Sequence, residues 1–155
     1  MRTLFWATLA LCACKDKSGD DTAGGADSGA NADSGGGVTG LEILGDYTDN
    51  YGGDHQITNE TWTQYTGTTI FHISQYDNDG DFLIAQNDAA NTYSPELWSR
   101  FDWTTDGAGT LYYCQSAYDA ADEATALATQ AADPADPATT GCSSFAWTTL
   151  TPVAR

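Results

Sequence analysis

Basic residues are scarce in this chain of 155 residues. It holds 22 Asp and Glu residues against five Lys and Arg residues, which gives a formal net charge of −17. Arg100 is the only Lys or Arg between Ser18 and Ala154. An acidic surface repels phosphate backbones and other copies of itself, so we expect no nucleic-acid partner and a monomeric protein.

Catalytic motifs are also missing. The sequence contains no Gly-x-Ser-x-Gly, no His-Glu-x-x-His and no phosphate-binding loop. We expect the two histidines, His55 and His72, to be structural or solvated. Pairs of carboxylates suited to glycoside hydrolysis arise by chance in so acidic a chain. We therefore do not expect an enzyme, and a hydrolase is kept only as the third of three functional interpretations.

The N-terminus carries one short apolar run, residues 3–11 (TLFWATLAL). It is far shorter than the roughly 20 residues of a membrane-spanning helix, and after Met1-Arg2 it fits the hydrophobic part of a signal peptide. The residues that follow, Leu11-Cys12-Ala13-Cys14, resemble the lipobox of bacterial lipoproteins, although Cys12 departs from the small residues usual at its position. The resemblance implies cleavage after Ala13 and a lipid on Cys14, which would anchor the protein to a membrane. The open alternative is an ordinary signal peptide and a secreted protein.

In Gram-negative lipoproteins an Asp after the lipidated cysteine retains the protein in the inner membrane. This chain has Lys15 at that position, so the resemblance implies the outer membrane and leaves open which side of that membrane the protein faces.

The next segment is predicted to be a flexible linker. Residues 18–40 contain Gly, Ala, Ser, Asp, Asn and Thr with a single Val and no aromatic residue, so they cannot build a core. We therefore expect a signal peptide at residues 1–13, a lipid-anchored flexible linker at residues 14–40, and one folded domain at residues 41–155.

Short segments with strand-like alternation, separated by turn residues, fill this domain. Strands are expected at residues 41–47, 68–76, 82–87, 96–103, 110–117 and 143–150, with Phe145 and Trp147 on one face of the last. The Thr- and aromatic-rich segment 55–66 should bury Trp62. Residues 119–130 predict one short helix with Asp119 as its N-cap. The pattern predicts a mainly β domain, a small antiparallel barrel or sandwich, similar to lipocalin-like barrels in layout alone.

The strand at residues 98–103 (WSRFDW) holds the domain's one internal cation. Alternation with period two places Phe101 and Trp103 toward the core, and it places Trp98, Arg100 and Asp102 on the opposite face. The guanidinium of Arg100 is expected to stack on Trp98 and to pair with Asp102 or Glu96. Trp98, Arg100 and Asp102 then form either a site for an anionic or sugar-like ligand, or a structural pair that fixes the strand.

From Gly45 onward the chain is similar to an uncharacterised domain of bacterial lipoproteins. The residues that carry the resemblance are the Asn87-Asp88 pair in AQNDAANTY, the WSRFDW and LYYCQ strands, and the GC…F.WT ending. The resemblance implies a compact domain with one disulfide and no defined activity. In an exported protein, Cys114 and Cys142, the two cysteines outside the leader region, most simply form that disulfide. The competing interpretation, a metal site completed by His55 and His72, lacks a recognisable ligand spacing.

Residues 77–81 (DNDGD) allow two interpretations. Asp77, Asp79 and Asp81 provide oxygen ligands at alternate positions, as at the start of a calcium loop, but Phe82 stands where an EF-hand needs Gly and Asp88 stands where it needs Glu. The alternative is a β-hairpin turn centred on Asp79-Gly80. We therefore expect no cofactor beyond a weak calcium site at this turn.

Three functions remain open from the sequence. The first is a binding module for a small ligand or an envelope polymer, which would use Trp98 and Arg100. The second is a structural or protein-interaction module, and the third is the hydrolase. An exposed Arg100 in an aromatic pocket would favour the first, and an Arg100 buried against Asp102 would favour the second.

Overall fold

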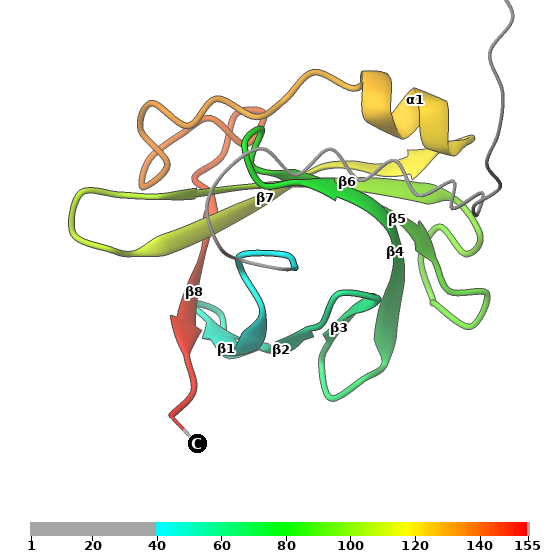
Figure 1. Cartoon of the computed structure of the whole chain (residues 1–155), viewed down its shortest axis with the longest axis horizontal. Coiled ribbons are helices and arrows are strands. Elements are labelled where there is room, and N and C mark those ends of the chain that lie inside the picture. The colour runs from blue at the N-terminus through cyan, green and yellow to red at the C-terminus, as the bar shows by residue number, and fades with distance from the viewer. Residues whose placement is uncertain (1–39, 155) are drawn as a thin grey trace, which may run out of the picture. The chain divides into compact units, whose positions relative to one another are not determined.

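The fold is a closed eight-stranded antiparallel β-barrel with one short helix. A computed structural model describes residues 40–154 of the chain. In sequence order the strands are β1 (Gly45–Asp49), β2 (Asp54–Ile57), β3 (Thr61–Gln64), β4 (Thr69–Asp77), β5 (Phe82–Asn87), β6 (Trp98–Thr105), β7 (Leu111–Ala120) and β8 (Thr148–Pro152). Each strand pairs with the next, and β8 closes the barrel on β1 (Figure 1). The expected mainly β fold is confirmed, and of the two expected architectures the barrel is the observed one.

The expectations for residues 1–39, including the lipid on Cys14, lie outside the described residues. Within residues 40–154, no helix has both the length and the apolar character needed to cross a membrane.

Local turn chemistry explains where several strands end. The hairpin turn after β4 forms as expected: Oδ1 of Asp77 accepts hydrogen bonds from the backbone N–H groups of Asp79 and Gly80. Segment 55–66, treated above as one unit, is divided between β2 and β3. The hydroxyl of Thr58 accepts from the N–H groups of Glu60 and Thr61 and so closes a turn between the two strands.

Among the boundaries expected from the sequence, those of the helix and of the last strand are wrong. Helix α1 (Glu123–Ala128) has Asp122 as its N-cap, because β7 continues to Ala120, which lies opposite Trp98 on β6 and is buried. Asp119, the expected N-cap, is therefore a strand residue. The last strand begins at Thr148 instead of residue 143, because backbone hydrogen bonds between Cys142 and Phe145 fold that stretch into a tight turn.

The two aromatic residues that precede β8 lie in different environments. Phe145 is exposed, whereas Trp147 is buried on the outer face of β7 against Tyr112 and Cys114. The two rings were expected to share one strand face. The turn at Cys142–Phe145 interrupts the alternation on which that expectation depended.

Large side chains fill the barrel interior. Trp62 is fully buried as expected, and its ring stacks on that of Phe101 with 4.6 Å between centroids. Phe71 and Tyr113 pack against the same pair. An eight-stranded barrel is just wide enough for its own side chains, so this interior is a hydrophobic core.

The first described residues cover one end of the barrel. Residues 41–44, which were expected to belong to the first strand, precede β1, and Leu41 and Ile43 insert into the core. The segment is held by a hydrogen bond from the N–H of Leu41 to Asn59 and by one from the Asn78 side chain to the carbonyl of Gly40. We call this the tether end; it also carries the loops at residues 58–60, 78–81 and 106–110.

Candidate functional site

The outer face of β6 is covered by helix α1 and the loop that follows it. Helix α1 packs on β5, β6 and β7 (Figure 1), where Ala126 joins Ile84 and Ala120 in a small apolar cluster. The polar face of WSRFDW is therefore not a solvent-facing surface. Arg100 is only 6% exposed and Asp102 only 4% exposed.

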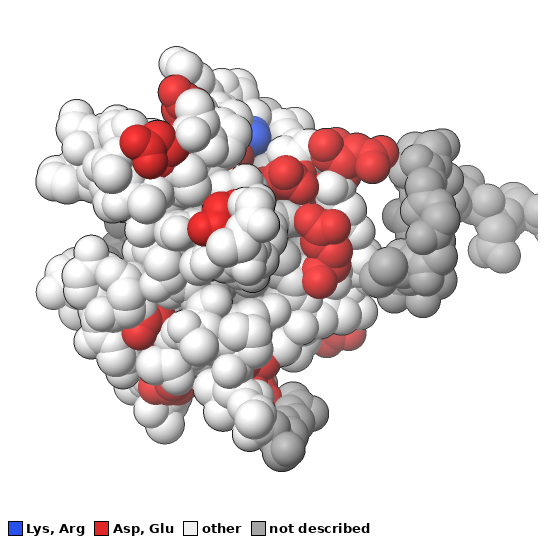
Figure 2. All heavy atoms as spheres, turned by 90° about the vertical axis from the view of Figure 1, so that its left-hand side faces the viewer, with Lys and Arg blue, Asp and Glu red and all other residues white. Residues whose placement is uncertain are grey.

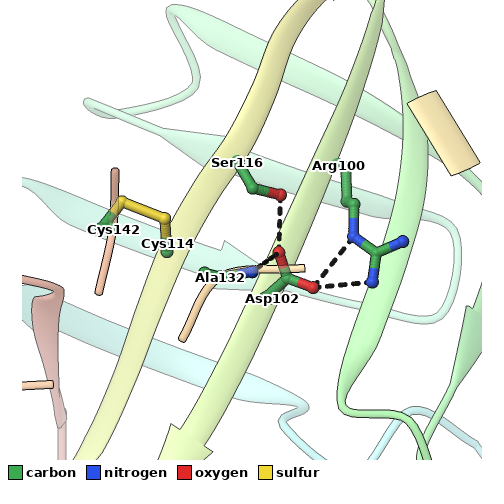
Figure 3. Close-up of a disulfide and its surroundings, with 6 residues drawn as sticks. All are labelled: Arg100, Asp102, Cys114, Ser116, Ala132 and Cys142. Carbon is green, nitrogen blue, oxygen red and sulfur yellow. Dashed lines mark hydrogen bonds and ion pairs between the residues drawn. A yellow bond between two sulfur atoms is a disulfide. The ribbon is translucent and has the colours of Figure 1, made fainter. Parts of the chain in front are cut away.

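Arg100 and Asp102 pair with each other beneath this cover. Nε and Nη2 of Arg100 each lie 2.9 Å from Oδ1 of Asp102 (Figure 3). The other carboxylate oxygen of Asp102 accepts from the Ser116 hydroxyl at 2.5 Å and from the N–H of Ala132 at 3.3 Å. Nη1 of Arg100 donates to the carbonyl of Leu127 at the end of α1. The pair thus joins two strands, the helix and the following loop.

This geometry favours the structural interpretation of the pair. The aromatic partner of Arg100 is Phe82, whose ring centroid lies 4.3 Å from the guanidinium carbon, where the sequence had suggested Trp98. Trp98 is half-buried in the cluster under α1. Each of the three guanidinium nitrogens of Arg100 and both oxygens of Asp102 contact protein groups, so Trp98, Arg100 and Asp102 do not present an open ligand-binding face.

The expected disulfide is present. Cys114 on β7 and Cys142 are joined, with their Cα atoms 5.5 Å apart (Figure 3). Cys114 is buried against Trp147 and Tyr112. The bond therefore ties the loop after α1 to the outer face of the barrel, on the same side as the Arg100–Asp102 pair.

The acidic turn at residues 77–81 serves as the connection between β4 and β5. Oδ1 of Asp77 is occupied by the turn's own N–H groups. Burial, and after it the nearby carboxylate of Glu42, raises the pKa of Asp81. Within residues 40–154 no group of three or more His, Cys, Asp or Glu side chains is placed to hold a metal ion. The calcium site suggested for Asp77, Asp79 and Asp81 gains no support from this geometry.

His55 belongs to a buried chain of hydrogen bonds inside the barrel. The indole Nε1 of Trp62 donates to Nδ1 of His55 at 3.1 Å, and because an indole N–H can only donate, Nδ1 must be the acceptor nitrogen. Nε2 of His55 then donates to Oδ2 of Asp49 at 3.0 Å. Oδ1 of Asp49 accepts from the N–H groups of Tyr51 and Gly53. His55 is structural, as expected.

Replacing Asp49 tests this chain of hydrogen bonds. Burial raises the pKa of Asp49, but the hydrogen bonds from His55, Gly53 and Tyr51 outweigh it, so the net pKa is lowered. We expect Asp49→Asn to reduce the free energy of unfolding at pH 7 by about 2 kcal/mol, because an amide leaves one of these buried donors without an acceptor. A carboxylate with a lowered pKa stabilises the fold above its unfolded pKa and loses that effect on acidification. The difference between the variant and the wild type in urea denaturation should therefore shrink below about pH 4; a difference independent of pH would contradict the assignment.

His72 lies on the barrel exterior. Its Nε2 is 2.7 Å from Oδ2 of Asp88, and its side chain is about half exposed. The hydrogen bond from His72 lowers the pKa of Asp88, and the N–H of Ala90 contributes in the same direction. The pair connects β4 to the loop after β5, which agrees with the solvated or structural role expected for this histidine.

Exposed tyrosines gather at the barrel end opposite the tether end. The three hairpin loops there, at residues 50–53, 65–68 and 88–97, each contain one tyrosine, whereas the three loops of the tether end contain no aromatic residue. Tyr51, Tyr65 and Tyr93 are 79%, 53% and 85% exposed, and Tyr118, near the end of β7, is 60% exposed. We call these loops with the last residues of β7 the tyrosine end.

Hydrogen bonds connect the loops of the tyrosine end to one another. The N–H of Tyr65 donates to the carbonyl of Asp54, so the first two loops are adjacent. The side chain of Asn91 bonds both the N–H and the carbonyl of Ile70, which fixes the third loop beside the second. Asn87 donates to the carbonyls of Ser94 and Tyr118 and so extends the connection to β7. The tyrosines are therefore presented on a continuous, internally braced surface.

The backbone of this surface is held in uncommon conformations. Tyr65, Thr66, Ser94 and Glu96 have φ between 48° and 61°, a region that residues other than Gly seldom adopt. Thr66 is fixed there by bonds from its N–H and its hydroxyl to Asp54. Such conformations persist only where the surroundings enforce them, so the loops are ordered before any partner arrives.

Sequence reasoning missed the tyrosine end, although a signal was present. In an up-and-down barrel, alternate loops lie at the same end, and alternate loops of this chain carry the tyrosines. The division of segment 55–66 into two strands had to be known first, because it shifts Tyr65 from a strand into a loop.

Two open depressions lie toward the tether end of the described barrel. One of about 540 Å³ lies between Glu42, Tyr47, Leu111 and Pro152 among others. The other, of about 460 Å³, lies between Leu44, Gln56 and Asn59 among others, and none of the tyrosine-end residues lines either one. No protein-family model, curated protein or solved structure was found to match the chain.

Proposed function

We propose that the protein is a lipid-anchored lipoprotein of the bacterial outer membrane that acts as a non-catalytic binding module for a macromolecular partner. The contact surface is the tyrosine end. The observation that carries the proposal is the placement of Tyr51, Tyr65 and Tyr93, one on each hairpin loop of a single barrel end, above an interior filled with side chains.

Tyrosine suits such a surface for a physical reason. Its ring provides a large contact area with few rotatable bonds, while its hydroxyl stays hydrated when no partner is bound. Loops rich in Tyr, Ser, Gly and Asn bind other macromolecules in antibody domains through these properties. The loop at residues 50–53 (NYGG) consists entirely of such residues, and the loop at residues 88–97 (DAANTYSPEL) contains one Asn, one Tyr and one Ser.

The position of the first described residue is compatible with this contact surface. The carbonyl of Gly40 accepts a hydrogen bond from the side chain of Asn78 at the tether end. Gly40 therefore lies at the opposite end of the barrel from the loops that carry Tyr51, Tyr65 and Tyr93.

The interaction-module function also fits the buried Arg100–Asp102 pair. A small-ligand site around Trp98 and Arg100 would need an accessible guanidinium, and this one is bonded to Asp102 and Leu127. A ligand inside the barrel would have to displace Trp62 and Phe101. A partner would therefore contact the loops of the tyrosine end and not the interior of the barrel.

Photo-crosslinking in the cells that make the protein tests this proposal. With p-benzoylphenylalanine at Tyr51 or at Tyr93, we expect crosslinked adducts after irradiation, because both side chains would lie in the contact. The matched control places the same residue at Tyr76, an exposed tyrosine on β4 outside the tyrosine end. Adducts from Tyr76 alone, or from all three positions equally, would overturn the proposed contact surface.

A further inference from the structure

The charge around the tyrosine end has one sign. Within residues 40–154 the only Lys or Arg is Arg100, which is buried and paired, so no Lys or Arg of this part of the chain offsets the surface carboxylates. Figure 2, which views the molecule from the left-hand side of Figure 1 and so from the side of the β6–β7 hairpin, shows several acidic groups and one small basic patch on that face. Asp54, Glu96 and Asp119 are exposed on or beside the tyrosine-bearing loops. Hydrogen bonds from Thr66 lower the pKa of Asp54, which therefore stays ionised at neutral pH.

Exposed aromatic rings beside carboxylates match the chemistry of a guanidinium. The face of a Tyr ring attracts a cation, and Arg also stacks its plane on the ring. A neighbouring carboxylate accepts two hydrogen bonds from the same group. A neutral glycan would gain from the rings but not from the charge, and an anionic polymer would be repelled. We propose that the partner of the tyrosine end is a basic, arginine-rich polypeptide segment; this inference rests on the proposed function above.

The first test measures binding of defined peptides to the full-length chain purified in detergent. The probe is a ten-residue Arg-Ser repeat carrying a fluorophore, and fluorescence anisotropy gives its Kd. We expect binding that weakens as salt rises, because the contact includes charge pairs. A Glu-Ser repeat of the same length and a neutral N-acetylglucosamine oligomer should not bind. Absence of binding by the Arg-Ser peptide would overturn the inference.

Two matched aromatic variants separate contact from general attraction. Tyr51→Ser/Tyr93→Ser removes two exposed rings from the tyrosine-bearing loops. Tyr76→Ser/Phe145→Ser removes two exposed rings that lie on none of those loops, one on β4 and one in the turn beside Cys142, without any change in charge. Two cation–π contacts at an exposed surface correspond to roughly a tenfold change in Kd. We expect that loss only for the first variant, and equal Kd values for the two variants would overturn the inference.

Two variants of equal net charge test the electrostatic contribution to peptide binding. Glu96→Gln/Asp119→Asn removes two carboxylates at the tyrosine end, and Glu60→Gln/Asp79→Asn removes two exposed carboxylates from loops of the tether end. Both variants have the same net charge. We expect a several-fold weaker Kd for the first and a value near wild type for the second. Equal weakening would show non-specific attraction of a polycation and overturn the inference.

The two proposals fail in different ways. If Tyr51 and Tyr93 form crosslinks in cells but the Arg-Ser peptide shows no preference for the tyrosine end, the binding surface stands and its partner is not cationic. If the N-acetylglucosamine oligomer binds and Tyr51→Ser/Tyr93→Ser abolishes that binding, the partner is a neutral glycan and the inference falls. If neither crosslinks nor peptide binding depend on these tyrosines, both proposals are wrong.

Discussion

Arg100→Ala is expected to lower the free energy of unfolding by about 3–5 kcal/mol, because the substitution leaves the buried carboxylate of Asp102 without its cation. Asp102 is 4% exposed, so water can replace little of the lost interaction. The Leu127 carbonyl also loses its donor, which should loosen α1 from β6. Urea denaturation followed by tryptophan fluorescence measures the effect.

Variants at the same two positions serve as controls for this prediction. Arg100→Ala/Asp102→Ala removes both charges, so its loss should be clearly smaller than the sum of the two single losses. Arg100→Lys keeps the charge but cannot place two N–H groups against one carboxylate, and an intermediate loss is expected. If Arg100→Ala lowered the free energy of unfolding by less than about 1 kcal/mol, the pair would behave as an ordinary surface ion pair and its structural role would be refuted.

Loss of the disulfide is the second large effect. Cys114→Ala/Cys142→Ala is expected to reduce the free energy of unfolding by about 3.5 kcal/mol on the chain-entropy model, since the bond closes a loop between residues 28 positions apart. Alanine is preferred to serine at Cys114, because the site is buried against Trp147 and Tyr112 and a hydroxyl there would lack a partner. Denaturation in urea, with and without a reductant, measures the change.

The reductant provides the control for the cysteine variant. It should destabilise the wild type by about the same amount as the double substitution and leave the double variant unchanged. The disulfide holds the loop between α1 and β8. Limited proteolysis should therefore cut this loop faster in the reduced wild type and in the double variant than in the oxidised wild type. A wild type that is equally stable with and without reductant would contradict the prediction.

Most of the barrel could be predicted from local patterns. Residues 82–87 were expected to return as a strand after the DNDGD turn, and β5 has these bounds; the turn itself formed where its Asp and Gly residues indicated. These features depend on residues a few positions apart, so the sequence displays them directly. Trp62, Phe101 and Trp103 were assigned to the core by the same reasoning, and all three are buried.

The errors arose where distant residues decide the local structure. Asp119 looked like an N-cap, but pairing with β6 keeps β7 extended through this position. Residues 143–147 alternate as a strand would, yet the disulfide at Cys142 and the turn beside it prevent strand formation. Tertiary pairing overrides local propensity at both positions.

For the candidate site, the sequence by itself determined which chemical groups are available. These are one internal arginine, many surface carboxylates, two cysteines that can pair and the tyrosines of alternate loops. Only the tertiary structure decided what these residues do. Residues of α1 and of the loop after it, more than 25 positions along the chain, cover Arg100 and Asp102 and convert an apparent binding face into a buried pair. Closure of the barrel brings Tyr51, Tyr65 and Tyr93 to one end, because the spatial grouping of loops depends on strand order and register, which no short stretch of sequence encodes.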